Sequence, residues 1–161
     1  MSSFIANASN QSTGNSQATI ANNGFFPDIN IAAMRDRMRI DSTITTPRLV
    51  DAATQAIIHV NQQLSIFKAS KIELGFTKLS EIPGETIGNE SVLISQYLRA
   101  VYSIAKADLI ERYKDYDTTA SSLDDKKMIE FLSTGPDECR RNAQWAISDL
   151  VGRNRSTIEL I

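Results

Sequence analysis

The stretch that decides the fold is residues 91–119, SVLISQYLRAVYSIAKADLIERYKDYDTT, in the second half of the 161-residue chain. Apolar side chains recur in it every three to four residues, which places them on one face of an α-helix. The members of this stripe are Leu93, Tyr97, Ala100, Ile104, Ala107 and Ile110, with Val101 beside them. The pattern predicts a helix over about residues 90–116, which Asn89 can cap. Its broad apolar face is typical of the central helix of a bundle.

A second long helix is predicted upstream, over about residues 47–70. Thr46 suits the N-cap position, and Pro47 suits the first helical position, where a missing N–H is no loss. Residues 75–89 contain three glycines and one proline, so we expect a loop with one helical turn around residues 79–82. The apolar stripe of the upstream helix is Leu49, Ala53, Ile57, Val60, Leu64 and Phe67.

Shorter helices are predicted on both sides of this pair. Asp28 or Asn30 can cap a short helix whose stripe is Ile31, Met34 and Met38. Another helix runs from Ser121 or Ser122 through Leu132, and Gly135-Pro136 breaks it, because proline lacks the N–H and clashes with the preceding turn. A last helix covers residues 136–151, with Gly152 suited to the position after its end. Its inner face carries Cys139, Ala143, Ile147 and Leu150.

The composition divides the chain into three parts. Residues 1–24 are rich in Asn, Ser, Gln and Thr, and the first charged side chain is Asp28, so we expect a polar arm that lies along another subunit. Residues 25–152 form an all-α domain of three to five helices. Residues 153–161 form an extended tail, because TIEL at residues 157–160 alternates polar and apolar side chains as strands do.

Charge and residue counts exclude several classes of function. The formal net charge is −2, and a protein that grips duplex DNA usually has a basic excess. Cys139 is the only cysteine and His59 the only histidine, so neither an intrachain disulfide nor a Cys/His zinc site can form. We expect no cofactor, no resident metal and no membrane span, and the single thiol fits a reducing cytosol.

Three local clusters offer alternative functions. Four arginines, Arg35, Arg37, Arg39 and Arg48, surround a helix-turn-helix-like segment, so a small DNA-binding regulator is the alternative hypothesis. Glu111 with Asp115 and Asp117 could hold Mg²⁺, although these residues also suit a helix end. A Ser-His or Cys-His pair would depend on His59, which lies within an apolar helical stretch and is expected to be a core or edge residue. We therefore expect a protein that is not an enzyme.

Four stretches of the chain resemble one known family. The chain is similar to the head completion protein L family of peduovirus-type contractile-tailed bacteriophages, over nearly everything after residue 24. The matching stretches are GFFP at residues 24–27 leading to MRI at 38–40, ITTPRL at 44–49 running on to Val60-Asn61, residues 91–119, and RRNAQWAISDLVGRNRSTIELI at 140–161.

The resemblance implies a structural role in the virion neck, at the head–tail interface. Such proteins join the portal protein after DNA packaging and form a homo-oligomeric adaptor ring that follows the portal's twelvefold symmetry. They offer a surface to a tail-terminator or other neck protein, and genomic double-stranded DNA passes through the channel without sequence-specific binding. Assembly takes place in the host cytoplasm. The resemblance implies neither catalysis nor a cofactor.

The expected contacts with the portal or a neighbouring subunit lie at the two ends of the domain. An apolar patch at Phe25 and Phe26 is one part of the expected partner site. The tail is the other, because its alternating pattern suits addition to an exposed sheet edge. Burial of its three apolar side chains would contribute roughly 5–9 kcal/mol per subunit before ordering costs, at about 1.5–3 kcal/mol each. The partner residues of the tail are Arg153, Arg155, Ile158, Leu160 and Ile161.

Overall fold

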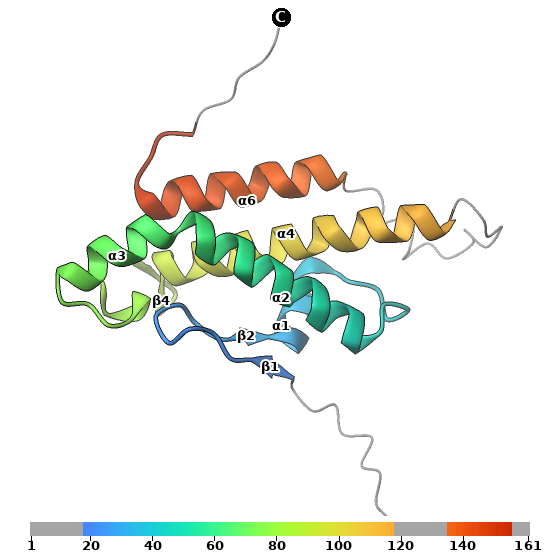
Figure 1. Cartoon of the computed structure of the whole chain (residues 1–161), viewed down its shortest axis with the longest axis horizontal. Helices are drawn as coiled ribbons and strands as arrows, with labels where there is room; N and C mark the ends of the chain where they lie inside the picture. The colour runs from blue at the N-terminus through green and yellow to red at the C-terminus, as the bar shows by residue number, and fades with distance from the viewer. Residues whose placement is uncertain (1–17, 118–134, 156–161) are drawn as a thin grey trace, which may run out of the picture.

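The computed structural model describes residues 18–117 and 135–155, with the side chains of residues 113–117 excepted. Helices dominate these residues, so the all-α prediction is confirmed (Figure 1). The helices are α1 (Ile31–Met38), α2 (Thr46–Gln63), α3 (Ser65–Glu73), the short 3₁₀ helix η1 (Leu79–Glu81), α4 (Val92–Asp117) and α6 (Pro136–Val151). Two small antiparallel pairs accompany them, β1 (Thr19–Ile20) with β2 (Ile29–Asn30), and β3 (Thr86–Ile87) with β4 (Glu90–Ser91).

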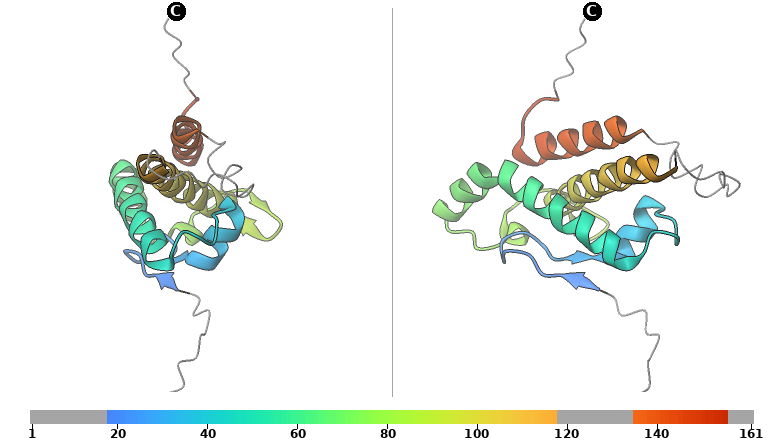
Figure 2. Two further views of the ribbon diagram at one scale, coloured as in Figure 1. Left: turned by 90° about the vertical axis from the view of Figure 1, so that its right-hand side faces the viewer. Right: turned by 45° about the vertical axis from the view of Figure 1, so that its right-hand side comes forward.

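The predicted central helix, α4, is the axis of the fold. Its packing against α6 and against α2 is the most extensive among the described elements, and Figure 2 shows the two helices on different sides of it. Small side chains let the helix backbones approach closely, as at Ala100 of α4, Ala56 of α2 and Ala146 of α6, all fully buried. The core is therefore built on α4, and α2 and α6 are held apart by it.

The ends of the helices follow from local chemistry. The Asn30 side chain accepts a hydrogen bond of 2.8 Å from the Ala33 N–H and so caps α1. Gly152 ends α6 in the left-handed conformation, with φ of 73°, and the Arg153 N–H donates to the Ser148 carbonyl at 2.8 Å. Both ends agree with the prediction. The expected turn of helix at residues 79–82 is also present, as η1.

Two predicted boundaries need correction. The single helix over residues 47–70 is broken at Leu64 (φ −91°, ψ 7°) into α2 and α3. Asn89 does not cap α4. It forms the β3–β4 hairpin turn with Gly88, and both residues have positive φ, 66° for Asn89 and 57° for Gly88, as tight two-residue hairpin turns require.

The folded domain begins earlier than residue 25. β1 pairs with β2, and the Ile31 N–H donates to the Ala18 carbonyl at 2.9 Å, so residues 18–24 belong to the domain rather than to an arm. The predicted helix over residues 121–132 lies outside the described residues. Within the two described ranges, no helix is both long and apolar enough to cross a membrane, and no three metal-ligating side chains cluster.

Candidate interaction surface

The aromatic pair expected to bind a partner lies in the core. Phe25 and Phe26 are 4% and 2% exposed. The Phe26 ring stacks on the Tyr97 ring at 4.6 Å between centroids, and the two phenylalanine rings meet edge to face at 5.0 Å. This burial corrects the expectation that they contact a portal or neighbouring subunit, because neither ring is open to one.

Below these rings, three polar side chains form a closed ring of hydrogen bonds. The Asn22 amide donates to the Tyr97 hydroxyl at 2.7 Å, Tyr97 donates to Asn61 Oδ1 at 2.8 Å, and the Asn61 amide donates to Asn22 Oδ1 at 2.9 Å. We call Asn22, Asn61 and Tyr97 the N-terminal clasp. Burial raises the pKa of Tyr97 to about 12, and the bond from Asn22 opposes this rise. The clasp fixes the chain next to β1 on α2 and α4.

At the other end of the domain, the chain leaves α6 along a fixed path. Arg155 forms a two-pronged contact with the Asp149 carboxylate, with distances of 2.9 and 2.5 Å. Its guanidinium lies 5.4 Å from the centre of the Trp145 ring, and that of Arg141 lies 5.3 Å from the same ring. The hydrogen bond from Arg155 lowers the pKa of the Asp149 carboxyl, and the same bond raises the pKa of Arg155. We call Trp145, Asp149 and Arg155 the tail anchor.

The anchor gives Arg155 a structural role beside the predicted partner role. Its guanidinium is engaged by its own helix, and this contact holds the chain against α6 as far as residue 155. Arg153 is exposed. The partner roles of both arginines stay predictions, and Ile158, Leu160 and Ile161 lie outside the described residues.

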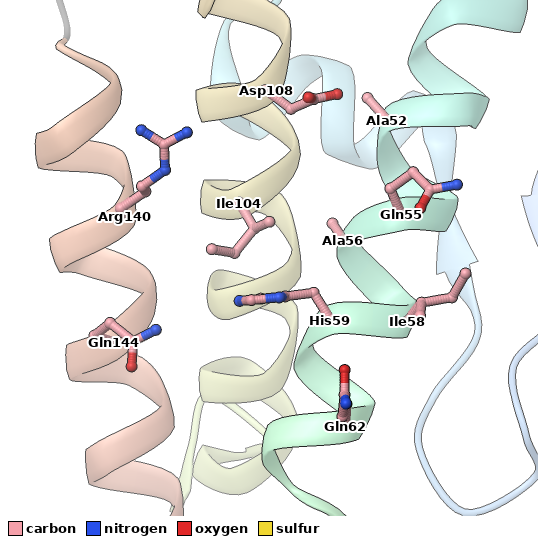
Figure 3. A pocket seen from close by; sticks show the side chains of 10 residues that line it. All are labelled: Ala52, Gln55, Ala56, Ile58, His59, Gln62, Ile104, Asp108, Arg140 and Gln144. Atoms are coloured by element: carbon pink, nitrogen blue, oxygen red, sulfur yellow. The ribbon is translucent and has the colours of Figure 1, made fainter.

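A groove runs between α2 and α6, and α4 forms its floor (Figure 3). It exists because both helices pack on α4 rather than on each other. Its volume is about 480 Å³, with Ile104 at its base and His59 and Gln144 on opposite walls. A second hollow of about 390 Å³ shares Gln144 and continues the groove between α3 and the end of α6. Side-chain amides and hydroxyls are frequent in its walls: Gln55, Gln62, Gln63, Ser70, Gln144 and Ser148.

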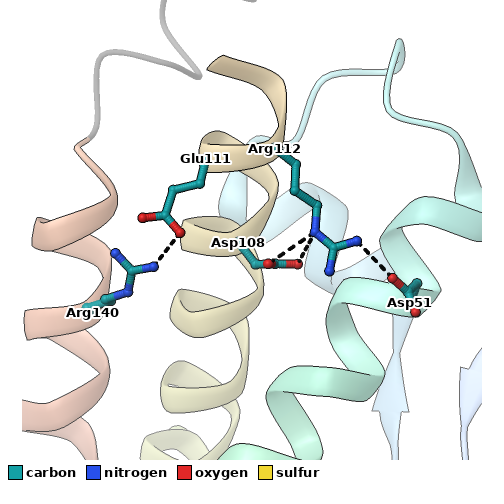
Figure 4. A network of polar contacts seen from close by, with 5 residues as sticks. All are labelled: Asp51, Asp108, Glu111, Arg112 and Arg140. Atoms are coloured by element: carbon teal, nitrogen blue, oxygen red, sulfur yellow. Dashed lines mark hydrogen bonds and ion pairs between the residues drawn. The ribbon is translucent and has the colours of Figure 1, made fainter. Parts of the chain in front are cut away.

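Charged residues at one end of the groove are paired with one another (Figure 4). Arg112 of α4 contacts Asp51 of α2 at 3.1 Å and Asp108 on its own helix at 3.1 Å. Arg140 of α6 pairs with Glu111 of α4. Asp108 raises the pKa of Arg112, and the hydrogen bond that Arg140 donates to Glu111 raises the pKa of Arg140. These pairs connect all three helices. Beyond them the groove is lined mainly by uncharged groups, with Arg153 as the charged residue of the second hollow.

The solvent-facing side of α2 and α3 carries no Asp, Glu, Lys or Arg from Ala52 to Ile72. Within it Ile58, Ile66 and Ile72 are 55%, 78% and 50% exposed, and α3 has no buried residue at all. The two lysines of this stretch are half-buried and lie over phenylalanine rings. We call the exposed residues the uncharged face; they are Gln55, Ile58, His59, Gln62, Gln63, Ser65, Ile66, Ala69, Ser70 and Ile72.

An uncharged, apolar-studded surface of this length is typical of a protein–protein interface, whose centre is depleted of charge. The sequence prediction missed it, because it followed the buried stripe of the helix and not the opposite side. The sequence nevertheless indicates this face, because no charged residue other than the two half-buried lysines occurs between Asp51 and Glu73. His59, expected in the core or at its edge, is exposed on this face.

The other candidate sites receive little support from the geometry. Arg35 donates to the backbone carbonyls of Asp41 and Ile44 at 2.8 and 2.9 Å, so it holds a loop instead of facing DNA. Glu111 is paired with Arg140, and the side chains of Asp115 and Asp117 lie outside those described. Cys139 is buried, as predicted, and burial raises the pKa of its thiol.

Comparison with known proteins agrees with a structural role. The family model described as phage head completion protein (GPL) matches residues 20–161. The head completion/stabilization protein of Escherichia phage P2 is 37% identical over 145 residues, covering 90% of this chain and 84% of that protein. The probable head completion/stabilization protein of Haemophilus phage HP1 is 25% identical over 142 residues, covering 88% and 91%. No solved structure matches. The chain therefore belongs to the phage head completion protein family, and its role is in completing the phage head.

Proposed function

We propose that the chain forms an adaptor ring in the virion neck, which docks on the portal protein after DNA packaging and joins the head to the tail. The observation that carries the ring is the uncharged face of α2 and α3. A helix such as α3, with no buried residue and exposed isoleucines, leaves apolar surface in water unless another molecule covers it.

A ring would cover this face in every copy. Ring contacts are heterologous, so one patch on a subunit meets a different patch on the next subunit, and closure repeats that contact around the axis. The charge pattern is compatible with passing DNA. The net charge is −2, and several arginines are paired within the chain, so the surface has no strong basic excess to hold the genome.

Docking on the portal is assigned to the tail that follows the tail anchor. Arg155 and Asp149 hold the chain on α6 as far as residue 155, so the tail starts from a fixed point, which reduces the ordering entropy lost on binding. Residues 156–161, STIELI, then supply alternating apolar side chains suited to a sheet edge on the partner. The opposite side of the ring is left for a tail-terminator or other neck protein. Assembly would take place in the host cytoplasm.

The proposal is tested by comparing the full chain with a variant lacking residues 156–161. Purified portal is mixed with each protein, and particles are counted by negative-stain electron microscopy. We expect ring-shaped density beneath the portal for the full chain and bare portals for the truncated chain, with unchanged helical circular dichroism. Equal docking by the truncated chain would refute the tail's role. A full chain that neither forms rings nor binds the portal would refute the proposal itself.

A further inference from the structure

We infer that the groove between α2–α3 and α6 receives the N-terminal segment, residues 1–17, of a neighbouring copy. The inference rests on the proposed ring, and it assigns an occupant to the groove. Residues 1–17 read MSSFIANASNQSTGNSQ and contain no charged side chain. Eleven of the seventeen are Asn, Gln, Ser or Thr, and Phe4-Ile5 is their only pair of adjacent large apolar residues.

The groove and the segment match in chemistry. Away from the ion pairs at one end, the walls present glutamine amides and serine hydroxyls beside Ile58 and Ile66. Amides and hydroxyls can donate and accept, so they can satisfy the backbone and side chains of an amide-rich segment. Phe4 and Ile5 would cover the exposed isoleucines. The tail fits less well, because Arg155 is held by Asp149 of its own helix and Glu159 would bring a carboxylate into walls that are mostly uncharged.

The segment is also long enough for the groove. From Ala52 to Ser70 the groove follows nineteen residues of helix, a length of about 27 Å at ~1.5 Å per residue. An extended chain covers that distance with about eight residues at ~3.3 Å each. Residues 1–17 can therefore fill the groove and still leave about nine residues to connect it to the parent domain.

The place where the segment joins the domain favours a neighbour's groove over its own. β1 lies on the side of the domain away from α6 in all three views (Figures 1 and 2). The N-terminal clasp holds the chain there through Asn22, so the segment starts from a fixed point on the side remote from its own groove. A fixed start lowers the entropy lost when the segment binds next door.

Cysteine cross-linking of the full-length chain tests the occupant. One protein carries Ile5→Cys, a second, tagged protein carries Gln62→Cys in the exposed wall of the groove, and the two are mixed and mildly oxidised. A disulfide requires the two Cα atoms to approach to about 4.4–6.8 Å, so a mixed dimer reports a close contact. The native Cys139 is 2% exposed and does not compete. The matched control replaces Gln62→Cys by Ile87→Cys, an exposed site on the β3–β4 hairpin outside the groove.

We expect at least about tenfold more mixed dimer for the groove pair than for the hairpin control, because a bound segment raises the local thiol concentration. Equal yields from the two pairs would overturn the inference. An intramolecular disulfide in one chain that carries both Ile5→Cys and Gln62→Cys would show that the segment comes from the same chain, and would overturn the neighbour as its source. A dominant cross-link from Ile158→Cys to the groove would assign the groove to the tail instead. If the chain forms rings but gives no cross-link in the groove, this inference alone is refuted. If it gives the cross-link but forms no rings, the proposed adaptor ring is refuted.

Discussion

Replacement of Tyr97 by phenylalanine removes one hydroxyl from the N-terminal clasp and leaves the ring stacked on Phe26. Tyr97 is fully buried, so removal of its hydroxyl does not change the surface that the protein exposes to water. Asn61 Oδ1 loses its donor, and the Asn22 amide keeps only its bond of 3.0 Å to the Pro27 carbonyl. A buried polar group left without a partner costs about 1–3 kcal/mol. We therefore expect Tyr97→Phe to lower the free energy of unfolding by about 2 kcal/mol near neutral pH.

The same substitution changes how stability depends on pH. The pKa of Tyr97 is raised in the folded chain to about 12, against 10.0 for an ordinary tyrosine. A raised folded pKa means that the unfolded state loses its proton first. The stabilisation is complete below the unfolded pKa and is lost as the pH rises through the folded pKa. Between these values the wild type should lose about 1.4 kcal/mol per pH unit from this residue, and the phenylalanine variant should lose none.

The assay is urea unfolding followed by the fluorescence of Trp145, the single tryptophan. We expect the wild type to exceed Tyr97→Phe by about 2 kcal/mol at about pH 8, and this difference to fall by about 1 kcal/mol from about pH 10 to about pH 11, because the unfolded tyrosine is only half ionised at about pH 10. Tyr102 is buried but outside the clasp, so Tyr102→Phe serves as the control at about pH 8 and should stay close to the wild type. A difference between wild type and Tyr97→Phe that is absent at about pH 8, or constant to about pH 11, would refute the clasp.

Three further predictions concern the surface and the ends of the helices. Gly152→Ala should destabilise the domain by about 1–2 kcal/mol in thermal unfolding, because φ is 73° there, whereas the added carbon meets nothing within 4 Å. The control is Gly135→Ala, a position that is equally open but has φ of −64°, and it should not destabilise the domain. Equal destabilisation by the two substitutions would contradict the role of the positive φ. Ile66→Arg should abolish ring formation in sedimentation experiments without lowering the melting temperature, whereas Ile87→Arg, at 68% exposure, should leave rings intact; rings from both would refute the interface. Arg155→Ala should weaken portal binding and increase the quenching of Trp145 by iodide while the helical content stays the same, and unchanged quenching would argue against the tail anchor.

Much of the fold could be predicted because its signals are local. The starts of α2 and α6 are marked by proline, the end of α6 by Gly152, and their buried faces by helical spacing. The break at Leu64 left no such mark, because Leu64 continues the apolar stripe and is itself fully buried. Residues 18–24 were assigned to an arm because what holds them is distant in sequence, as in the bond from Asn22 to Tyr97 across 75 residues.

The interaction surface was harder to predict than the helices. Phe25 and Phe26 formed an apolar patch in the sequence, and an isolated patch of that kind looks the same whether it is core or interface. The groove depends on how α2 and α6 sit on α4, which no local pattern encodes. The tail anchor depends on Arg155 turning back to Asp149 after the glycine. The uncharged face, by contrast, could have been found by following the exposed side of the helix.

The most direct test of the adaptor role is electron cryomicroscopy of the assembled neck at residue resolution. We predict a closed ring of copies beneath the portal, with the uncharged face of α2 and α3 covered at each subunit contact. Residues 156–161 should lie on the portal. A neck in which that face is open to solvent, or in which the chain occupies no position next to the portal, would contradict the account.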